Sequence, residues 1–257
     1  MSILKSAIHG RVLVLTLDGP ESRNALGPEV YAAGLAALSE APARAGAVVL
    51  TGAGGNFCSG GNLNGIFARR AAGEAATRAE IDRLNGLIRA LRASPLPVIG
   101  AVEGWAAGAG FSLALGCDML VASRAARFVM AYVKIGLSPD GGGSAALGRM
   151  VPRQIAAELL MEGTPIGAER LHALGLVNEL TEPGAALDAA LSRAERLTQG
   201  PRAALAAIKR LIGSAPVSGF DAQLDAERDA FARNLIGPDA GEGIAAFFDK
   251  RPPVFGA

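Results

Sequence analysis

The chain has 257 residues, of which half are hydrophobic and 19% are charged, with a formal net charge of +1. This length allows one large domain, or a domain with an appendage, and it allows a sizeable core. Near-neutral charge without long Lys/Arg runs argues against nucleic acid or an anionic membrane as a partner. The longest N-terminal apolar run, at 12–15, is too short for a signal peptide or membrane span. Cys58 and Cys117 lack any zinc-type spacing, so we expect a cytoplasmic protein with reduced thiols.

The first 180 residues predict strands and helices in irregular alternation. A hairpin is expected over 2–18, turning at His9–Gly10, and a helix begins near Pro28. The patterns that follow predict, in chain order, a strand at 48–51, a helix at about 77–93, strands at 97–102 and 119–122, an extended segment at 128–136, helices at 166–174 and 185–197, and an extended segment at 177–180 between them.

From about residue 200 the β-forming residues thin out, and three helical patterns remain near 202–212, 220–234 and 239–249. The chain therefore predicts stacked sheets wrapped by helices, followed by a helical C-terminal portion. A helical tail with apolar faces docks on its own core or on a second subunit.

Three common catalytic motifs are absent. The segment GAGGNF at 52–57 follows a strand, but Phe57 stands where a dinucleotide fingerprint needs its third glycine. Ser59 and Ser144 do not lie in G-x-S-x-G. His9 and His172, the two histidines, are expected to be solvated, so Ser-His and Cys-His mechanisms are disfavoured.

Two glycine-rich turns remain, at 56–63 and 104–110, each after a short strand. A strand, a glycine turn and a helix start leave backbone N–H groups with few side chains over them. Two such donors aimed at one carbonyl oxygen would each contribute about 3–4 kcal/mol as negative charge develops there. The alternative is tight packing of one backbone against another.

Four motifs in order carry a resemblance to a known family: GPESRNAL, VVLTGAGGNFCSGGNL, PVIGAVEGWAAGAGFSLALGCDMLVAS and FVMAYVKIGLSPDGGGS. Together they resemble the crotonase (enoyl-CoA hydratase/isomerase) superfamily over almost the whole chain. The resemblance implies an α/β fold, a ββα spiral acyl-CoA-binding core at 1–198 and a C-terminal helical trimerisation region at 199–257. It also implies a homotrimer or a dimer of trimers.

The resemblance places the oxyanion hole on the backbone N–H groups of Ser59 and Ala109. The residues that it implies for substrate binding are Arg23, Ala25, Leu26, Gly60, Gly61, Asn62, Leu63, Gly108, Tyr132, Phe247 and Lys250. Phe247 and Lys250 match positions that often reach the CoA of a neighbouring subunit. Coenzyme A enters as part of the substrate, and no metal, nucleotide redox cofactor or prosthetic group is implied.

The family's hydratases grip water between two glutamates, and this chain has Ser112 and Tyr132 at those positions. The remaining acid is Asp140, in the segment LSPDGGGS. Local chemistry favours Asp140 as a helix cap in a Pro-Asp-Gly turn. The resemblance favours it as the acid/base, because the superfamily's single-acid isomerases carry an acid here and the epoxyphenylacetyl-CoA isomerases share SPDGG.

A helix start lowers the pKa of a carboxyl, whereas an apolar pocket raises it, and a base at position 140 needs the second effect. Candidates for the apolar wall are Phe67, Trp105, Phe111, Met130 and Tyr132. We therefore expect a CoA-thioester isomerase. The alternatives are a hydratase or ring-hydrolysing enzyme of fatty-acid or phenylacetate breakdown, and a non-catalytic acyl-CoA binder. The acyl chain is not readable from the sequence.

Overall fold

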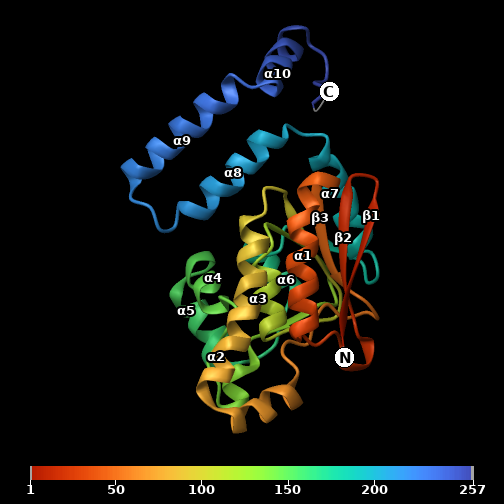
Figure 1. Ribbon diagram of the computed structural model, residues 1–257, viewed down its shortest axis with the longest axis vertical. Helices are drawn as coiled ribbons and strands as arrows, with labels where there is room; N and C mark the ends of the chain where they lie inside the picture. Colours follow the sequence, from red (N-terminus) through yellow and green to blue (C-terminus); the bar gives the residue numbers. More distant parts are fainter. Residues whose placement is uncertain (1, 256–257) are drawn as a thin grey trace.

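The computed structural model describes residues 2–255 and contains two sheets wrapped by helices (Figure 1). The larger sheet has six strands in the order β1 (Ile3–His9), β2 (Val12–Asp18), β3 (Ala47–Gly52), β4 (Val98–Val102), β6 (Met119–Ser123) and β9 (Glu179–Thr181). The smaller sheet has the order β5 (Trp105–Ala107), β7 (Arg127–Val129) and β8 (Ile166–Gly167). In the larger sheet, β1 and β2 form the predicted antiparallel hairpin and the other neighbours are parallel.

Helices connect and cover these strands, and they continue alone at the C-terminal end. They are α1 (Pro28–Arg44), α2 (Leu63–Ala93), α3 (Ala109–Leu115), α4 (Gly143–Met150), α5 (Arg153–Ala157), α6 (Ala168–Ala173), α7 (Ala186–Thr198), α8 (Arg202–Ser214), α9 (Phe220–Leu235) and α10 (Pro238–Phe248). Short helical turns are η1 (Pro20–Ser22), η2 (Ala131–Ile135) and η3 (Glu158–Glu162). The predicted α/β class and the helical C-terminal region are confirmed, while the domain division at residue 198 stays a prediction.

The inner strands β2, β3, β4 and β6 are buried on both faces, as is typical of parallel strands, whereas the edge strand β1 is largely exposed. Leucines of β2 point into the main core, and its valines point to the opposite face. On that opposite face lies α7, whose buried alanines at 186, 190 and 194 are spaced four residues apart. This spacing places three small side chains on one helix stripe, which lets α7 lie close to the sheet.

Two predicted segments differ in the structure. α2 begins at Leu63 rather than near 77, because Asn62 caps it by accepting a hydrogen bond from the Gly65 N–H at 3.1 Å. Its first half is polar and is interrupted at Gly73, which has φ +85°. The predicted extended segment at 128–136 is strand only to Val129 and then forms the 3₁₀ turn η2.

The C-terminal helices α9 and α10 lie at the end of the molecule away from the sheets (Figure 1). Lys209 attaches α8 to the core, since its ammonium group lies 2.7 Å from Asp118 and donates to the carbonyls of Leu91 and Leu96. Within residues 2–255, no helix is both long and apolar enough to cross a membrane.

Candidate active site

The two predicted glycine turns lie side by side. Cys58 and Ala106 form an isolated parallel bridge, in which the Cys58 N–H donates to the Trp105 carbonyl at 2.9 Å and the Ala107 N–H donates to the Cys58 carbonyl at 2.8 Å. Gly110 has to be glycine here, because a Cβ on it would lie 2.4 Å from the Cys58 carbonyl oxygen. Both the tight backbone packing and the meeting of the two turns are therefore present.

The predicted oxyanion donor Ser59 is not free to act. Its N–H donates to the Arg23 carbonyl at 2.9 Å, and its hydroxyl donates to the Ser22 carbonyl at 2.8 Å. An amide has one hydrogen, which here is already used. The prediction for the Ser59 amide is wrong in this geometry: the residue holds the loop against the segment that precedes α1.

Two other amides at the meeting point have no acceptor among residues 2–255. They belong to Gly61, two residues after Ser59, and to Ala109, the first residue of α3. The first N–H groups of a helix lack intrahelical acceptors and carry the positive end of its dipole. The turns are close, because a Cβ on Gly60 would lie 2.6 Å from the Ala107 carbonyl oxygen and 3.4 Å from the Ala109 nitrogen.

Asp140 does not cap a helix. The N-cap of α4 is Gly142, and it receives no side-chain hydrogen bond. The Asp140 carboxylate instead accepts a hydrogen bond from the Tyr132 hydroxyl at 2.6 Å, and the Asp140 carbonyl accepts one from the Ser112 hydroxyl at 2.9 Å. The side chains at both positions expected for hydratase glutamates therefore contact the one acid of the loop.

Burial dominates the electrostatics of this acid. It raises the pKa of the Asp140 carboxyl, and the Tyr132 hydrogen bond and the charge of Arg69 oppose that rise only in part. Among the predicted wall residues, Phe111 and Met130 are fully buried, whereas the side chains of Phe67 and Trp105 are exposed. The pKa of Asp140 is raised on balance, and this is the shift that a general base at neutral pH requires.

The predicted CoA-binding segments border one cavity. Buried Asn24 fixes the first segment by donating to the carbonyls of Ala53 and Asn56, and the Leu26 N–H joins it to the second by donating to the Gly60 carbonyl at 2.7 Å. A cavity of about 290 Å³ opens between them. Polar and apolar residues line it together: Ser2, Ser22, Ala25, Leu26, Gly27, Pro28, Glu29, Asn62, Asn64, Gly65, Arg69 and Glu80.

Sequence reasoning missed a charged pair beside this cavity. Glu80 on α2 is buried, 3.0 Å from Arg83 and 4.0 Å from Arg69. A signal was present, since Glu80 lies on the same face of the predicted helix as Leu84 and Leu87. An acid within an apolar stripe indicates a buried, paired carboxylate.

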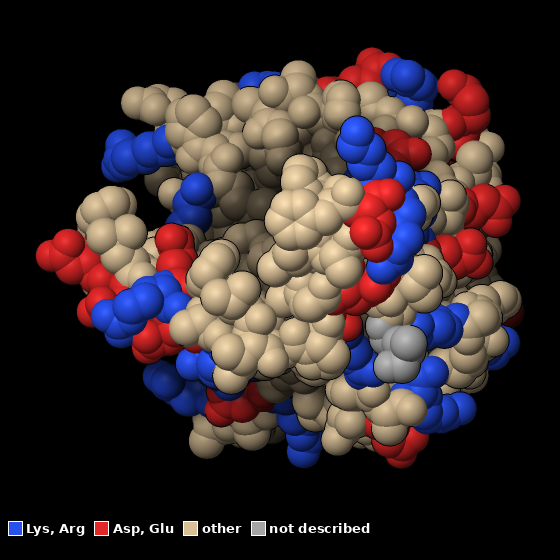
Figure 2. Space-filling view, turned by 90° about the horizontal axis from the view of Figure 1, so that it is seen from above, with Lys and Arg blue, Asp and Glu red and all other residues tan. Residues whose placement is uncertain are grey.

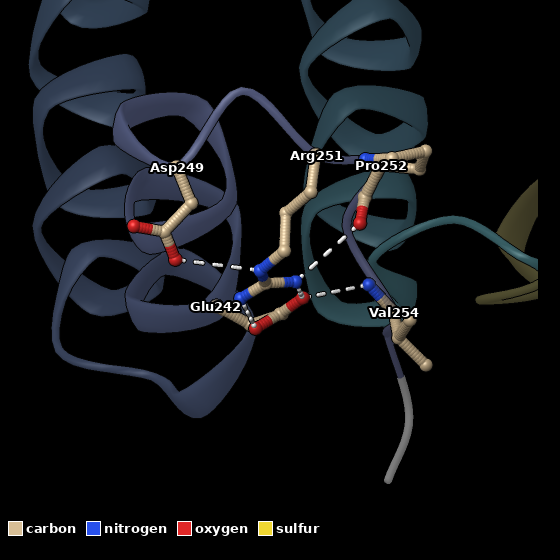
Figure 3. A network of polar contacts seen from close by, with 5 residues as sticks. All are labelled: Glu242, Asp249, Arg251, Pro252 and Val254. Atoms are coloured by element: carbon tan, nitrogen blue, oxygen red, sulfur yellow. Dashed lines mark hydrogen bonds and ion pairs between the residues drawn. The ribbon is translucent and has the colours of Figure 1, made fainter.

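Within one chain, Phe247 and Lys250 are not brought to this site. Phe247 is 79% exposed on α10, and Lys250 follows the helix with φ +53°. There Arg251 forms a two-pronged ion pair with Glu242, whose carboxylate also accepts the Val254 N–H (Figure 3). The guanidinium and this amide hold the pKa of Glu242 at about 2, so its carboxylate is ionised at neutral pH and can keep both contacts.

Comparison with known proteins identifies similar sequences and structures. A family model described as Enoyl-CoA hydratase/isomerase matches residues 7–257. The chain is 37% identical over 258 residues to the 1,2-epoxyphenylacetyl-CoA isomerase of Escherichia coli (strain K12), covering 99% of this chain and 98% of that protein. It is 33% identical over 260 residues to the 2,3-dehydroadipyl-CoA hydratase of the same strain, covering 99% of each. The crystal structure of an enoyl-CoA hydratase from Polaromonas sp. JS666 matches with a TM-score of 0.96 at 51% identity over 98% of both chains.

Proposed function

The chain belongs to the enoyl-CoA hydratase/isomerase family, the crotonase superfamily, and on that premise we propose that it isomerises an enoyl-CoA thioester with Asp140 as the acid/base. Its fold is the crotonase fold, and its place in the family makes it an acyl-CoA enzyme, either a hydratase or an isomerase. The observation that carries the isomerase assignment is the partly buried Asp140 carboxylate, which is held by Tyr132 instead of capping α4.

The proposed oxyanion hole consists of the amides of Gly61 and Ala109. Both lie where the two glycine turns meet, and neither has an acceptor within the described chain. They would hold the thioester oxygen while it becomes an enolate oxygen. Each preorganised donor of this kind contributes about 3–4 kcal/mol to such a transition state.

The proposed chemistry needs one base that acts twice. Asp140 removes a proton from one acyl carbon, and the C–H electron pair moves into the enolate that the two amides stabilise. The protonated carboxyl then returns the proton to another carbon, which completes the double-bond shift. A raised pKa suits both steps, because the group must accept a proton and then release it.

We place the coenzyme A portion in the cavity between Ala25–Leu26 and Asn62. Its mixed lining, which includes Arg69 and two asparagines beside apolar residues, suits a ligand with both hydrogen-bonding and apolar groups. Arg23 follows the lining residue Ser22 in the chain, and its side chain is exposed with φ +51°. Leu63 and Gly108 lie in the same two turns and complete the predicted set.

The deciding variant is Asp140→Asn. We expect it to bind an acyl-CoA as the wild type does, in a calorimetric titration with butyryl-CoA, while isomerisation of 3-hexenoyl-CoA falls by roughly 10²–10⁴-fold, the usual contribution of a general base. Turnover equal to the wild type would refute the assignment. Mass spectrometry separates isomerisation, which leaves the mass unchanged, from hydration, which adds one water.

A hydratase is the second candidate, and the names of similar proteins favour it. Asp140 would then activate water without a second carboxylate, since Ser112 and Tyr132 stand at the glutamate positions. Family membership argues against the non-catalytic acyl-CoA binder that the sequence left open. Such a protein would bind butyryl-CoA but would not exchange the carbon-2 protons in heavy water.

We also propose that the C-terminal helices join copies of the chain into a trimer or a dimer of trimers. Viewed from above, uncharged side chains cover most of the centre of this end of the molecule and border a hollow (Figure 2). Large apolar side chains are exposed on or beside α8–α10: Ile208, Ile212, Phe220, Leu224, Phe231, Leu235, Ile236, Ile244, Phe247 and Phe248. Exposed apolar surface of this extent is typical of a subunit interface. Phe247 and Lys250 would then reach a neighbour's site.

A further inference from the structure

Tyr132 contacts both halves of the proposed site. Its hydroxyl donates to Oδ1 of Asp140 at 2.6 Å, a length typical of a hydrogen bond to a carboxylate. Its ring also lies against the turn that ends at Ala109, because a Cβ on Gly108 would be 3.6 Å from the Tyr132 Cζ atom. One side chain therefore contacts the proposed base and lies beside Gly108, the residue before the proposed oxyanion donor.

This contact makes the two oxygens of Asp140 unequal. Oδ1 is taken by the phenol, whereas no other residue within 2–255 donates a hydrogen bond to Oδ2. The main chain is fixed as well, since the Ser112 hydroxyl donates to the Asp140 carbonyl at 2.9 Å. Asp140 is thus held at its carboxylate by Tyr132 and at its main chain by Ser112, with Oδ2 left for a ligand.

We propose that Tyr132 is a positioning residue, which holds the Asp140 carboxylate so that Oδ2 alone faces the acyl carbons and exchanges the proton. This inference rests on the proposed isomerase function. Oδ2 accepts the proton from one acyl carbon and donates it to another, while the Tyr132 O–H bond stays intact throughout.

The charges facing this pair are few. Arg69 lowers the pKa of the Asp140 carboxyl from a distance, and the carboxylate in turn raises the pKa of the Tyr132 phenol beyond the rise that burial causes. The phenol therefore remains protonated at neutral pH and acts as a donor only. The Ser112 hydroxyl is the other polar side chain at this contact.

The test compares Tyr132→Phe with Tyr31→Phe, which alters the chain's second tyrosine in the same way. Tyr31 is also buried and lies within range of the charges of Asp140 and Glu80, but no hydrogen bond joins its hydroxyl to another described residue. With 3-hexenoyl-CoA, we expect kcat of Tyr132→Phe to fall roughly 10- to 100-fold, the range for loss of a hydrogen bond to a charged group, and KM to change less than about threefold. Tyr31→Phe should keep kcat within about twofold.

The pH profile separates positioning from mere packing. Loss of a hydrogen bond to the ionised form raises a carboxyl pKa, so the acid limb of kcat/KM should move to higher pH in Tyr132→Phe only. With ¹³C-labelled aspartate, the Asp140 resonance, identified by its absence in Asp140→Asn, should show the same shift in titration without any substrate.

An unchanged kcat and an unchanged Asp140 titration in Tyr132→Phe would overturn the positioning role. A different set of results would show that the proposed isomerase function itself is wrong. The wild type would then neither isomerise 3-hexenoyl-CoA nor exchange its protons, and the NMR titration would still decide whether Tyr132 holds the carboxylate.

Discussion

Gly60 offers a sharp test of where the oxyanion donors lie. It has φ +91°, and a Cβ built on it would lie 2.6 Å from the Ala107 carbonyl oxygen. Ordinary contacts of this kind are 3.4 Å or longer. In Gly60→Ala, one of the two glycine turns therefore has to move, and a shift of about 0.8 Å (3.4 − 2.6 Å) restores an ordinary contact. The turn at 107 leads directly to Ala109, and Gly61 follows on the other side, so any such movement separates the two proposed donors.

The size of the effect follows from this displacement. A misplacement of about 1 Å in a catalytic constellation costs roughly 10²-fold in rate, and each tenfold loss corresponds to about 1.4 kcal/mol. We expect kcat/KM of Gly60→Ala to fall about 100-fold. A side chain at positive φ adds roughly 1–2 kcal/mol of destabilisation of the fold, independently of catalysis.

Gly55→Ala is the matched control. Gly55 belongs to the loop just before the same turn and has φ +75°, but a Cβ on it meets no atom within 4 Å. Both variants carry the cost of positive φ, and only Gly60→Ala carries the collision. We would follow 3-hexenoyl-CoA isomerisation by the ultraviolet absorbance of the conjugated product, and stability by thermal melting. If kcat/KM of Gly60→Ala stays within threefold of that of Gly55→Ala, the donors do not lie at this junction.

Two further predictions concern charge and assembly. At pH 7, Asp140→Asn should have a higher melting temperature than the wild type, whereas at pH values below 3.8, the ordinary carboxyl pKa, it should have no such advantage. Burial raises the pKa of Asp140 in the folded protein, so the folded protein binds this proton more tightly than the unfolded chain does. The stability that the bound proton gives the wild type at low pH is lost as the pH rises through the raised pKa. Melting curves across this range check the sign, and a difference that does not change with pH would contradict it. Ile236→Glu, at a side chain that is 88% exposed on the C-terminal side of α9, should lower the mass measured by sedimentation to that of a monomer without lowering the melting temperature of the chain itself by more than a few degrees.

Local patterns predicted much of the framework. The hairpin, the helix from Pro28, the buried strands and the three C-terminal helices follow from periods of two and of 3.6 residues, which depend on neighbouring side chains alone. The meeting of the glycine turns was also predictable, since both follow parallel strands that end at one edge of the sheet. Glycine is required wherever two backbones approach this closely.

The identity of the free amides could not be read from the sequence. Whether the N–H of Ser59 or of Gly61 faces the site depends on the Arg23 carbonyl, which takes the Ser59 hydrogen from a segment 36 residues away in the chain. The first half of α2 was missed because its residues are mostly small or charged, and its apolar period is weak there. The Tyr132–Asp140 hydrogen bond was not predicted, because the segment 128–136 was expected to be extended. In the structure the 3₁₀ turn η2 reverses the chain and brings the two residues together.

Asp140 does not form the helix cap that its local sequence predicts, because of the glycines that follow it. A Pro-Asp-Gly sequence before a helix predicts a capping aspartate, yet three glycines follow, and Gly141 and Gly142 both take positive φ. This places the N-cap, Gly142, two residues beyond Asp140, and α4 begins at Gly143. The missing side chains also let the loop approach Ser112, because a Cβ on Gly143 would lie 2.6 Å from its hydroxyl oxygen.

Such a glycine run costs conformational entropy that an ordinary cap would not. What it achieves is to release the carboxylate from the helix and to place it against the Tyr132 hydroxyl, in surroundings that raise its pKa. The loop therefore favours the acid/base role of Asp140 on physical grounds that are independent of any relative.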